Sequence, residues 1–249
     1  MFRLDGKVAL VTGSSRGLGA AIALGLARAG ADVVLHASAP PEETAQRIRE
    51  GTTSRTHCLA ADLSSRAQAD RLIDEAVAAM GAVDILVNNA GIIRRAPAAE
   101  HSGEDWDAVI EINLTAVFRL CRAAGVHMLA RGKGKIVNIA SLLSFQGGIN
   151  VPAYAAAKGG VAQITKALAN EWAGRGVNVN AIAPGYMRTE NTRPLFQDDK
   201  RRQAILERIP AGRWGEPEDL CGAAVFLASA ASDYVHGHVL VVDGGWMGR

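Results

Sequence analysis

A tyrosine and a lysine four positions apart are the clearest candidates for chemistry in this sequence. Tyr154-Ala155-Ala156-Ala157-Lys158 is predicted to begin a helix, where residues i and i+4 share one face about 6 Å apart along the axis. A tyrosine hydroxyl has a pKa of about 10, too high for a base at neutral pH. A positive charge about 5 Å away, at an effective dielectric of about 20, favours the phenolate by about 3 kcal/mol, or roughly two pKa units. The pair predicts a general acid/base, although the same spacing also occurs by chance in surface pairs.

Two polar residues that precede this pair are further candidates. Ser141 ends a predicted strand at 135–140, at the sheet edge where doubly wound folds bind ligands, so its hydroxyl can hold a substrate oxygen. Asn113 lies inside a long predicted helix, where a side-chain amide usually has a specific partner. A satisfied, buried hydrogen bond is the alternative to a functional role for Asn113.

A glycine-rich segment, TGSSRGLG (12–19), follows the first predicted strand and begins the first predicted helix. This is the context of a dinucleotide-binding turn. Gly13 allows the sharp turn, Gly17 lets the backbone approach a pyrophosphate, and Gly19 allows close packing, while the helix N-terminus attracts phosphate. The spacing is G-x-x-x-G-x-G instead of the general G-x-G-x-x-G, so a purely structural turn is the alternative.

The end of the second predicted strand bears on which nicotinamide dinucleotide binds. An acidic residue there would bind the ribose diol and repel a 2′-phosphate. The sequence has Leu35-His36-Ala37-Ser38 and no carboxylate, while Asp32 lies at the opposite end of the strand, as a surface residue. Arg16 can pair with a phosphate and Ser38 can donate a hydrogen bond to it. These residues favour NADP; a solvated arginine at the helix start is the alternative.

Seven short runs rich in Val, Ile and Leu alternate with stretches of helical spacing. The predicted strands are 7–12, 32–36, 56–60, 84–89, 135–140, 177–182 and 238–242. The predicted helices are 17–29, 41–50, 66–80, 104–130, 153–175 and 217–229. Apolar residues at both alternating positions are typical of strands buried on two faces. The alternation predicts an α/β fold, a doubly wound and mostly parallel seven-stranded sheet of Rossmann-like type, in one domain over 1–249.

Residues 186–213 interrupt this alternation. The segment follows the sixth strand, is too long for a simple connection, and carries seven basic residues against four acidic ones. Long insertions after the C-terminal end of a strand are usually functional. We expect a lid over the active site; a solvated pair of surface helices is the alternative.

Composition narrows the class of function. The chain has 249 residues, 27 Lys+Arg against 25 Asp+Glu, and three cysteines. A net charge of +2 provides no basic surface for a nucleic-acid backbone. The cysteines lack CxxC and metal-ligand spacing, so we expect neither disulfides nor a metal. No secretory signal and no apolar run of the roughly 18 residues that cross a bilayer are visible. We expect a cytoplasmic protein with a small-molecule substrate and no nucleic-acid or membrane partner.

The chain resembles the short-chain dehydrogenase/reductase family over nearly its whole length. The resemblance rests on TGSSRGLG (12–19), Asp62-Leu63, NNAG (88–91), Asn113, Ser141, Tyr154-x-x-x-Lys158 and Pro184-Gly185, in this order and at these separations. The family implies a sheet in the order 3-2-1-4-5-6-7, usually a homotetramer, and hydride transfer between a nicotinamide and an alcohol or ketone, without a metal.

The resemblance also implies a role for each matching residue. Tyr154 is then the acid/base, and Lys158 lowers its pKa and holds the nicotinamide ribose. Ser141 orients the substrate carbonyl, and Asn113 fixes a water in the proton relay. Adenine would meet Asp62 and Leu63, the adenosine ribose and central sheet would border Asn89, Ala90 and Gly91, and the carboxamide would meet Thr189. All the dinucleotide-binding candidates together are Gly13, Ser15, Arg16, Gly17, Leu18, Gly19, Ser38, Asp62, Leu63, Asn89, Ala90, Gly91, Tyr154, Lys158, Pro184, Gly185 and Thr189.

Five stretches resemble a narrower group, the family members that act on deoxy sugar acids such as 2-deoxy-D-gluconate and 2-dehydro-3-deoxy-D-gluconate, generally with NAD. They are 88–95, 141–148, 180–192, 208–220 and 226–246. Arg94, Arg95 and Arg188 follow strand ends and can neutralise a carboxylate, and Gln146 can bind sugar hydroxyls. Each is otherwise a surface or interface residue. Arg16 departs from that group, which leaves NAD or NADP open.

Two other functions stay open at this point. A 3-oxoacyl-thioester reductase that uses NADPH is the alternative within the family, because the glycine turn and the acid-free second strand also resemble that group. A non-catalytic dinucleotide-binding scaffold would usually lack part of the set Asn113, Ser141, Tyr154 and Lys158, all of which are present.

Overall fold

Seven parallel strands form one sheet in the order β3-β2-β1-β4-β5-β6-β7. The computed structural model describes residues 1–249. The strands are β1 (Val8–Thr12), β2 (Asp32–Ala37), β3 (Thr56–Ala60), β4 (Ile85–Asn88), β5 (Gly134–Ile139), β6 (Val177–Pro184) and β7 (Val239–Val242). The predicted fold class and strand order are confirmed, and the strand ends differ from the predicted ones by at most two residues.

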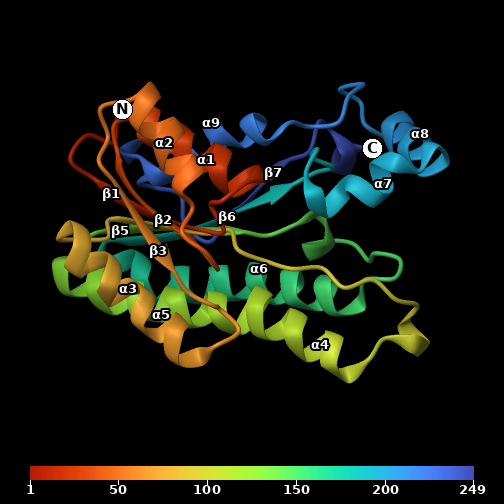
Figure 1. The fold of residues 1–249 in the computed structure, drawn as a ribbon, viewed down its shortest axis with the longest axis horizontal. Coiled ribbons are helices and arrows are strands. Elements are labelled where there is room, and N and C mark those ends of the chain that lie inside the picture. Colours follow the sequence, from red (N-terminus) through yellow and green to blue (C-terminus); the bar gives the residue numbers. More distant parts are fainter.

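Nine α-helices cover the two faces of this sheet. They are α1 (Gly17–Arg28), α2 (Glu42–Gly51), α3 (Arg66–Met80), α4 (Gly103–Ile110), α5 (Ala116–Arg131), α6 (Pro152–Trp172), α7 (Arg193–Gln197), α8 (Asp199–Arg208) and α9 (Cys221–Ala228). Figure 1 shows α1, α2 and α9 on one face and α3, α4, α5 and α6 on the other. None of these helices is both long enough and apolar enough to span a bilayer.

Three predicted helices are subdivided in the structure, and one of them, 153–175, is α6 followed by a 3₁₀ turn, Ala173–Arg175. The predicted helix 104–130 is α4 and α5 joined by a π-helical turn, Glu111–Thr115, which contains Asn113. A π-helical turn of this kind is frequent at functional sites, because it changes the direction of the side chains around it. The predicted helix 217–229 begins as a 3₁₀ turn, Pro217–Leu220, before α9.

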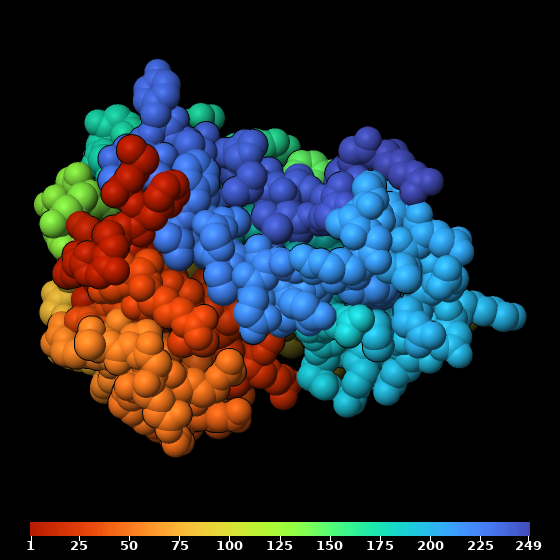
Figure 2. Space-filling view, turned by 90° about the horizontal axis from the view of Figure 1, so that it is seen from above, coloured from red at the N-terminus to blue at the C-terminus, as the bar shows by residue number.

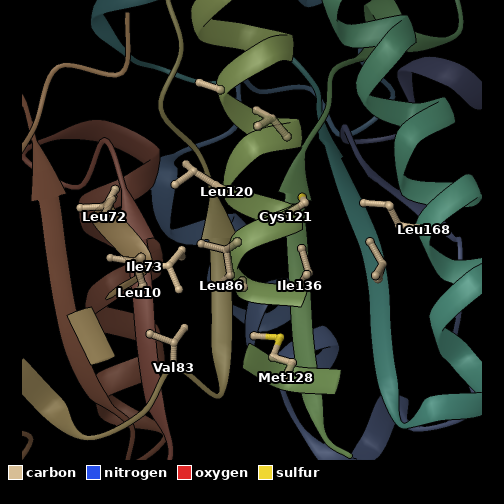
Figure 3. Packing of buried hydrophobic residues seen from close by; sticks show 14 of the residues in the cluster. Leu10, Leu72, Ile73, Val83, Leu86, Leu120, Cys121, Met128, Ile136 and Leu168 are labelled. Atoms are coloured by element: carbon tan, nitrogen blue, oxygen red, sulfur yellow. The ribbon is translucent and has the colours of Figure 1, made fainter. Parts of the chain in front are cut away.

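The sheet is buried in its centre and partly exposed at its edges. Every residue of β1 and β6 is buried, whereas β3 and β7 are only partly buried because each has a neighbouring strand on one side. Figure 3 shows Leu120, Cys121 and Met128 of α5 lying against Leu86 of β4 and Ile136 of β5. Full burial of such a side chain contributes about 1.5–3 kcal/mol, so this packing holds the helices, and the residues that follow the strands, in fixed positions.

Asp32 lies at the N-terminal end of β2, as predicted, but it is not a free surface carboxylate. Its Oδ2 is 2.6 Å from Nη2 of Arg55, and its Oδ1 accepts a hydrogen bond of 2.8 Å from the Arg55 backbone N–H. Asp32 therefore ties β2 to the start of β3, far from the carboxyl edge of the sheet.

The segment 186–213 contains a 3₁₀ turn, Glu190–Thr192, followed by α7 and α8. In Figure 2 it forms a lobe beside the N-terminal part of the chain, with an indentation between the two. Tyr186 and Phe196 of this segment pack with Trp214 and Trp246, with ring centroids 4.7–5.6 Å apart. This aromatic cluster gives the segment a small core of its own and holds it at the carboxyl edge.

Candidate active site

A cleft of about 700 Å³ runs along the carboxyl edge of the sheet, between the glycine turn and the 186–213 segment. In a parallel sheet the residues that follow the strands meet at this edge, so segments far apart in the sequence line one cleft. The predicted residues on its wall are Gly13, Ser15, Arg16, Gly17, Leu18, Gly19, Ser38, Asp62, Leu63, Asn89, Ala90, Gly91, Tyr154, Lys158, Arg188 and Thr189.

The glycine turn is closely packed against the protein at Gly13 and Gly19 and open toward the cleft at Gly17. A Cβ at Gly19 would lie 2.3 Å from the carbonyl oxygen of Gly13, and a Cβ at Gly13 would lie 2.8 Å from Cα of Ala90. Gly13 and Gly17 also have φ values of +63° and +55°, which favour glycine. At Gly17 the nearest atom to an added Cβ is Cγ2 of Thr189, 3.8 Å away, so the cleft is open above the start of α1. This turn fits a dinucleotide pyrophosphate, with the helix N-terminus beneath it.

Tyr154 and Lys158 lie on the first two turns of α6, which begins at Pro152, a residue type favoured at the first helical position. Nζ of Lys158 is 5.6 Å from the Tyr154 ring centroid and donates a 2.6 Å hydrogen bond to the carbonyl oxygen of Ile139. The lysine is 4% exposed, and burial lowers its pKa to about 8. Phenol and ammonium therefore share one pocket, as the spacing predicts.

The predicted effect of Lys158 on the tyrosine is not what the structure shows. Burial raises the pKa of Tyr154 above its usual value, and this outweighs a hydrogen bond from Ser141 and the positive charge of Arg95, which lower it. The sequence estimate considered a charge at a distance and left out the cost of removing the phenolate from water. The groups that lower the pKa of Tyr154 against the effect of burial are Ser141 and Arg95.

Ser141 follows β5 and begins a 3₁₀ turn, Leu142–Ser144. Its Oγ accepts a 3.1 Å hydrogen bond from the backbone N–H of Leu143, and Oγ of Ser144 donates a 2.7 Å bond to the carbonyl oxygen of Lys158. These bonds connect the turn after β5 to the first turns of α6. The Ser141 hydroxyl is thereby held next to Tyr154.

Asn113 is fully buried, and the backbone of Ile92 occupies its side-chain amide. Oδ1 accepts a 2.8 Å bond from the Ile92 N–H, and Nδ2 donates a 2.8 Å bond to the Ile92 carbonyl oxygen. The buried hydrogen bond left open as the alternative is therefore present. Its consequence is structural and local to the site, because it holds the segment after β4 that borders the cleft.

The four predicted substrate residues separate into two pairs. Arg188 lines the cleft, lies 4.8 Å from the Phe196 ring and is 3.3 Å from Glu216. Arg95 donates a 2.8 Å hydrogen bond to the carbonyl oxygen of Asn191, which belongs to the 186–213 segment expected to be the lid.

Like Arg95, the other two predicted substrate residues do not line the cleft. Arg94 pairs with Asp105 at 3.2 Å, and Gln146 lies against Sδ of Met247. Pro184 and Gly185 likewise do not line the cleft; a Cβ at Gly185 would lie 2.6 Å from Cα of Asp243, so this glycine serves close backbone packing.

Several cleft residues have no counterpart in the sequence prediction. They are His36, Ala37, Ala61, Ile92, Ile112, Ile139, Glu190, Asn191, Thr192, Arg193 and Phe196. Most belong to the lid or end a strand. Position at the C-terminal end of a predicted strand is the signal that could have identified His36 and Ile139, whereas nothing in the sequence indicates which side of the lid faces inward.

Known proteins similar to this chain agree with the geometry. Residues 13–247 match the protein family described as Enoyl-(Acyl carrier protein) reductase. The chain belongs to the short-chain dehydrogenase/reductase family. It is accordingly an NAD(P)-dependent dehydrogenase.

Three relatives illustrate the similarity. The chain is 54% identical over 249 residues to the 2-dehydro-3-deoxy-D-gluconate 5-dehydrogenase of Escherichia coli (strain K12), covering 100% of this chain and 98% of the relative. It is 53% identical over 252 residues to the enzyme of the same name from Bacillus subtilis (strain 168), covering 100% and 97%. The chain is also similar to a gluconate 5-dehydrogenase from Burkholderia cenocepacia J2315, whose crystal structure is in complex with NADP and tartrate. The sequence identity is 47% and the TM-score is 0.93, and the match covers 100% of this chain and 98% of that chain.

Proposed function

We propose that this dehydrogenase interconverts a secondary hydroxyl and a ketone on a small sugar acid, with 2-dehydro-3-deoxy-D-gluconate as the first candidate and 2-deoxy-D-gluconate as the second. The observation that carries the substrate class is the placement of two arginines. Arg188 lines the cleft, and Arg95 lies near enough to Tyr154 to act on its pKa. A guanidinium is suited to bind a carboxylate, and relatives with more than 50% identity are named for such a substrate.

Tyr154, Ser141, Lys158 and Asn113 each have a role in this proposal. Oη of Tyr154 accepts the proton of the substrate hydroxyl in oxidation and returns it in reduction. Ser141 holds the substrate oxygen, and Lys158 lies between Ile139 and the tyrosine ring, where it can meet the nicotinamide ribose. Asn113 holds the segment after β4 through Ile92; any contact of Asn113 with a relay water then comes from its backbone. The dinucleotide, when bound, supplies the hydride acceptor or donor.

The dinucleotide would be held by the residues that line the rest of the cleft. The glycine turn meets the pyrophosphate, Asp62 and Leu63 meet adenine, and Thr189 meets the carboxamide. Asn89 donates bonds of 2.9 and 3.0 Å to the carbonyl oxygens of Thr12 and Gly13, so it acts by fixing the turn.

We expect NADP to be preferred over NAD. Arg16 and Ser38 both line the cleft and are exposed, Arg16 has no ion-pair partner, and no carboxylate follows β2. A 2′-phosphate can therefore pair with Arg16, whereas no acidic group is present to select the ribose diol of NAD. The related gluconate 5-dehydrogenase structure contains NADP.

A homotetramer in the cytoplasm completes the proposal. Phe118, Val126 and Trp106 on α4 and α5 are 42%, 69% and 42% exposed, and the outer edge of β7 has no neighbouring strand. Exposed apolar residues and an unpaired strand edge are typical of contact surfaces between subunits. Trp246, in contrast, packs on Tyr186 and completes the local core.

Initial rates with a panel of sugar acids, each with NAD and NADP, test this function. We expect oxidation or reduction of a deoxy sugar acid and faster reaction at low NADP than at low NAD. Activity confined to 3-oxoacyl thioesters would overturn the substrate class. In the Tyr154→Phe variant, turnover should fall by several orders of magnitude while the dinucleotide still binds; unchanged turnover would remove the proton-transfer role.

A further inference from the structure

His36 is a buried histidine on the wall of the cleft that the reaction does not use. It is the penultimate residue of β2 and is 2% exposed. Its backbone is bound to the glycine turn: the His36 carbonyl oxygen accepts a 2.9 Å bond from the Ser14 N–H, and the His36 N–H donates a 2.9 Å bond to Oγ of Ser14. The side chain is therefore held between the turn that meets the pyrophosphate and the segment after β3.

The imidazole connects to the turn that follows β3. Nε2 lies 3.1 Å from the carbonyl oxygen of Ala61, the residue before Asp62 and Leu63. A carbonyl oxygen can only accept, so Nε2 carries the hydrogen and the ring is the Nε2–H tautomer. Burial keeps the ring neutral, with a pKa of about 4, and Nδ1 has no partner. One neutral N–H···O bond therefore joins the ends of β2 and β3 where both border the cleft.

We propose that His36 is a positioning residue for the adenosine half of the dinucleotide, because its Nε2–H holds the Ala61 carbonyl and so fixes the turn of Asp62 and Leu63 that forms one side of the adenine slot. The inference extends the proposed cofactor site and rests on its adenine end being at Asp62 and Leu63. Because adenosine is common to NAD and NADP, the contribution is equal for both dinucleotides. Arg16, by contrast, acts on the 2′-phosphate and distinguishes them.

Four variants separate this role from simple filling of space. His36→Leu removes the donor and keeps an apolar side chain of similar size. His36→Gln places an amide N–H near the position of Nε2, whereas His36→Asn is one methylene shorter and cannot reach Ala61. His57→Leu, on the exposed side of the neighbouring edge strand β3, removes a histidine outside the cleft and is the matched control.

Binding of NAD and of NADP to the full-length protein is measured by isothermal titration calorimetry, with kcat at saturating dinucleotide. We expect His36→Leu and His36→Asn to raise both dissociation constants by the same factor, about tenfold, as for one buried hydrogen bond left unmade. His36→Gln and His57→Leu should stay within about twofold of wild type, and kcat should be unchanged in all four variants.

Three results would overturn the inference. They are unchanged binding by His36→Leu, a loss confined to NADP, and a His36→Gln protein that is folded by circular dichroism yet binds as weakly as His36→Asn. Where His36→Leu does not fold, the comparison of Gln with Asn decides. Dinucleotide binding is independent of turnover, so a protein that oxidises none of the sugar acids still tests His36, and a failure at His36 leaves the substrate proposal unaffected.

Discussion

The burial of Lys158 predicts that the charge of this lysine lowers the free energy of unfolding, and that this cost depends on pH. The structure lowers the pKa of Lys158 from 10.5 to about 8, with burial as the cause. The unfolded chain therefore binds more protons between about pH 8 and 10.5, and the stability contributed by this position rises with pH through that window. Below pH 8 the full cost of burying the charge is present, about 3 kcal/mol for a shift of this size.

The Lys158→Met variant has no buried charge at this position, so it does not carry this cost. It also lacks the hydrogen bond to the Ile139 carbonyl oxygen, and leaving that oxygen unpaired costs about 1–3 kcal/mol. The lost hydrogen bond has the same cost at every pH, so the change with pH isolates the charge. Relative to the variant, wild type should gain about 2 kcal/mol of unfolding free energy between pH 7 and pH 9.5. For a chain of this size that corresponds to about 4–8 °C in Tm.

Thermal and urea unfolding of the ligand-free proteins at pH 7 and pH 9.5, at one protein concentration, measures this difference. Lys166→Met, at an exposed position two turns further along α6, is the matched control. We expect Lys158→Met to lose turnover, and its free energy of unfolding relative to wild type to fall as the pH rises from 7 to 9.5. The free energy of unfolding of Lys166→Met should change with pH in the same way as that of wild type. The reasoning is refuted if the two variants show the same pH dependence.

Four shorter predictions follow from other contacts. Arg16→Ala should raise KM for NADP about 10- to 100-fold, as for a lost charge-assisted hydrogen bond, with KM for NAD nearly unchanged; an equal loss for both would contradict the assignment. Gly19→Ala should abolish dinucleotide binding by calorimetry, since the added Cβ meets the Gly13 carbonyl oxygen, and normal binding would contradict this. Arg95→Gln should shift the pH at which kcat is half-maximal upward, because its charge lowers the pKa of Tyr154; a downward shift or none would be contrary. As the pH falls from 6.5 to 4, wild type should lose about 2–3 kcal/mol of unfolding free energy relative to His36→Gln. The pKa of His36 is about 4 in the folded protein and 6.5 in the unfolded chain, so the unfolded chain takes up the proton first. Urea unfolding that gives the same pH dependence for both proteins would contradict this.

Local patterns predicted the parts of the site whose position depends on nearby residues. The glycine turn needs only a strand before it and a helix after it, and Tyr154 and Lys158 need only one helix, so both were accessible from spacing. The strand order came from the resemblance and is confirmed by the pairing of β1 with β2 and β4. These features are determined within about ten residues or by a recurrent topology.

Contacts between distant residues were not accessible in this way. The Asn113 amide is used by Ile92, 21 positions away, and the His36 ring by Ala61, 25 positions away. The burial that raises the pKa of Tyr154 depends on everything packed around α6, and the expected effect of the Lys158 charge left this burial out. Spacing predicts which groups can meet, whereas the free energy of a charge depends on the water that the whole fold excludes.

The two groups that oppose the burial of the Tyr154 phenolate belong to segments held by other parts of the site. Ser141 is fixed through the turn after β5, and the guanidinium of Arg95 donates to the Asn191 carbonyl oxygen in the lid. Both groups lower the pKa of Tyr154, although the effect of burial is larger than theirs. The hydrogen bond from Arg95 to Asn191 therefore connects the 186–213 segment to a positive charge that lowers the pKa of Tyr154.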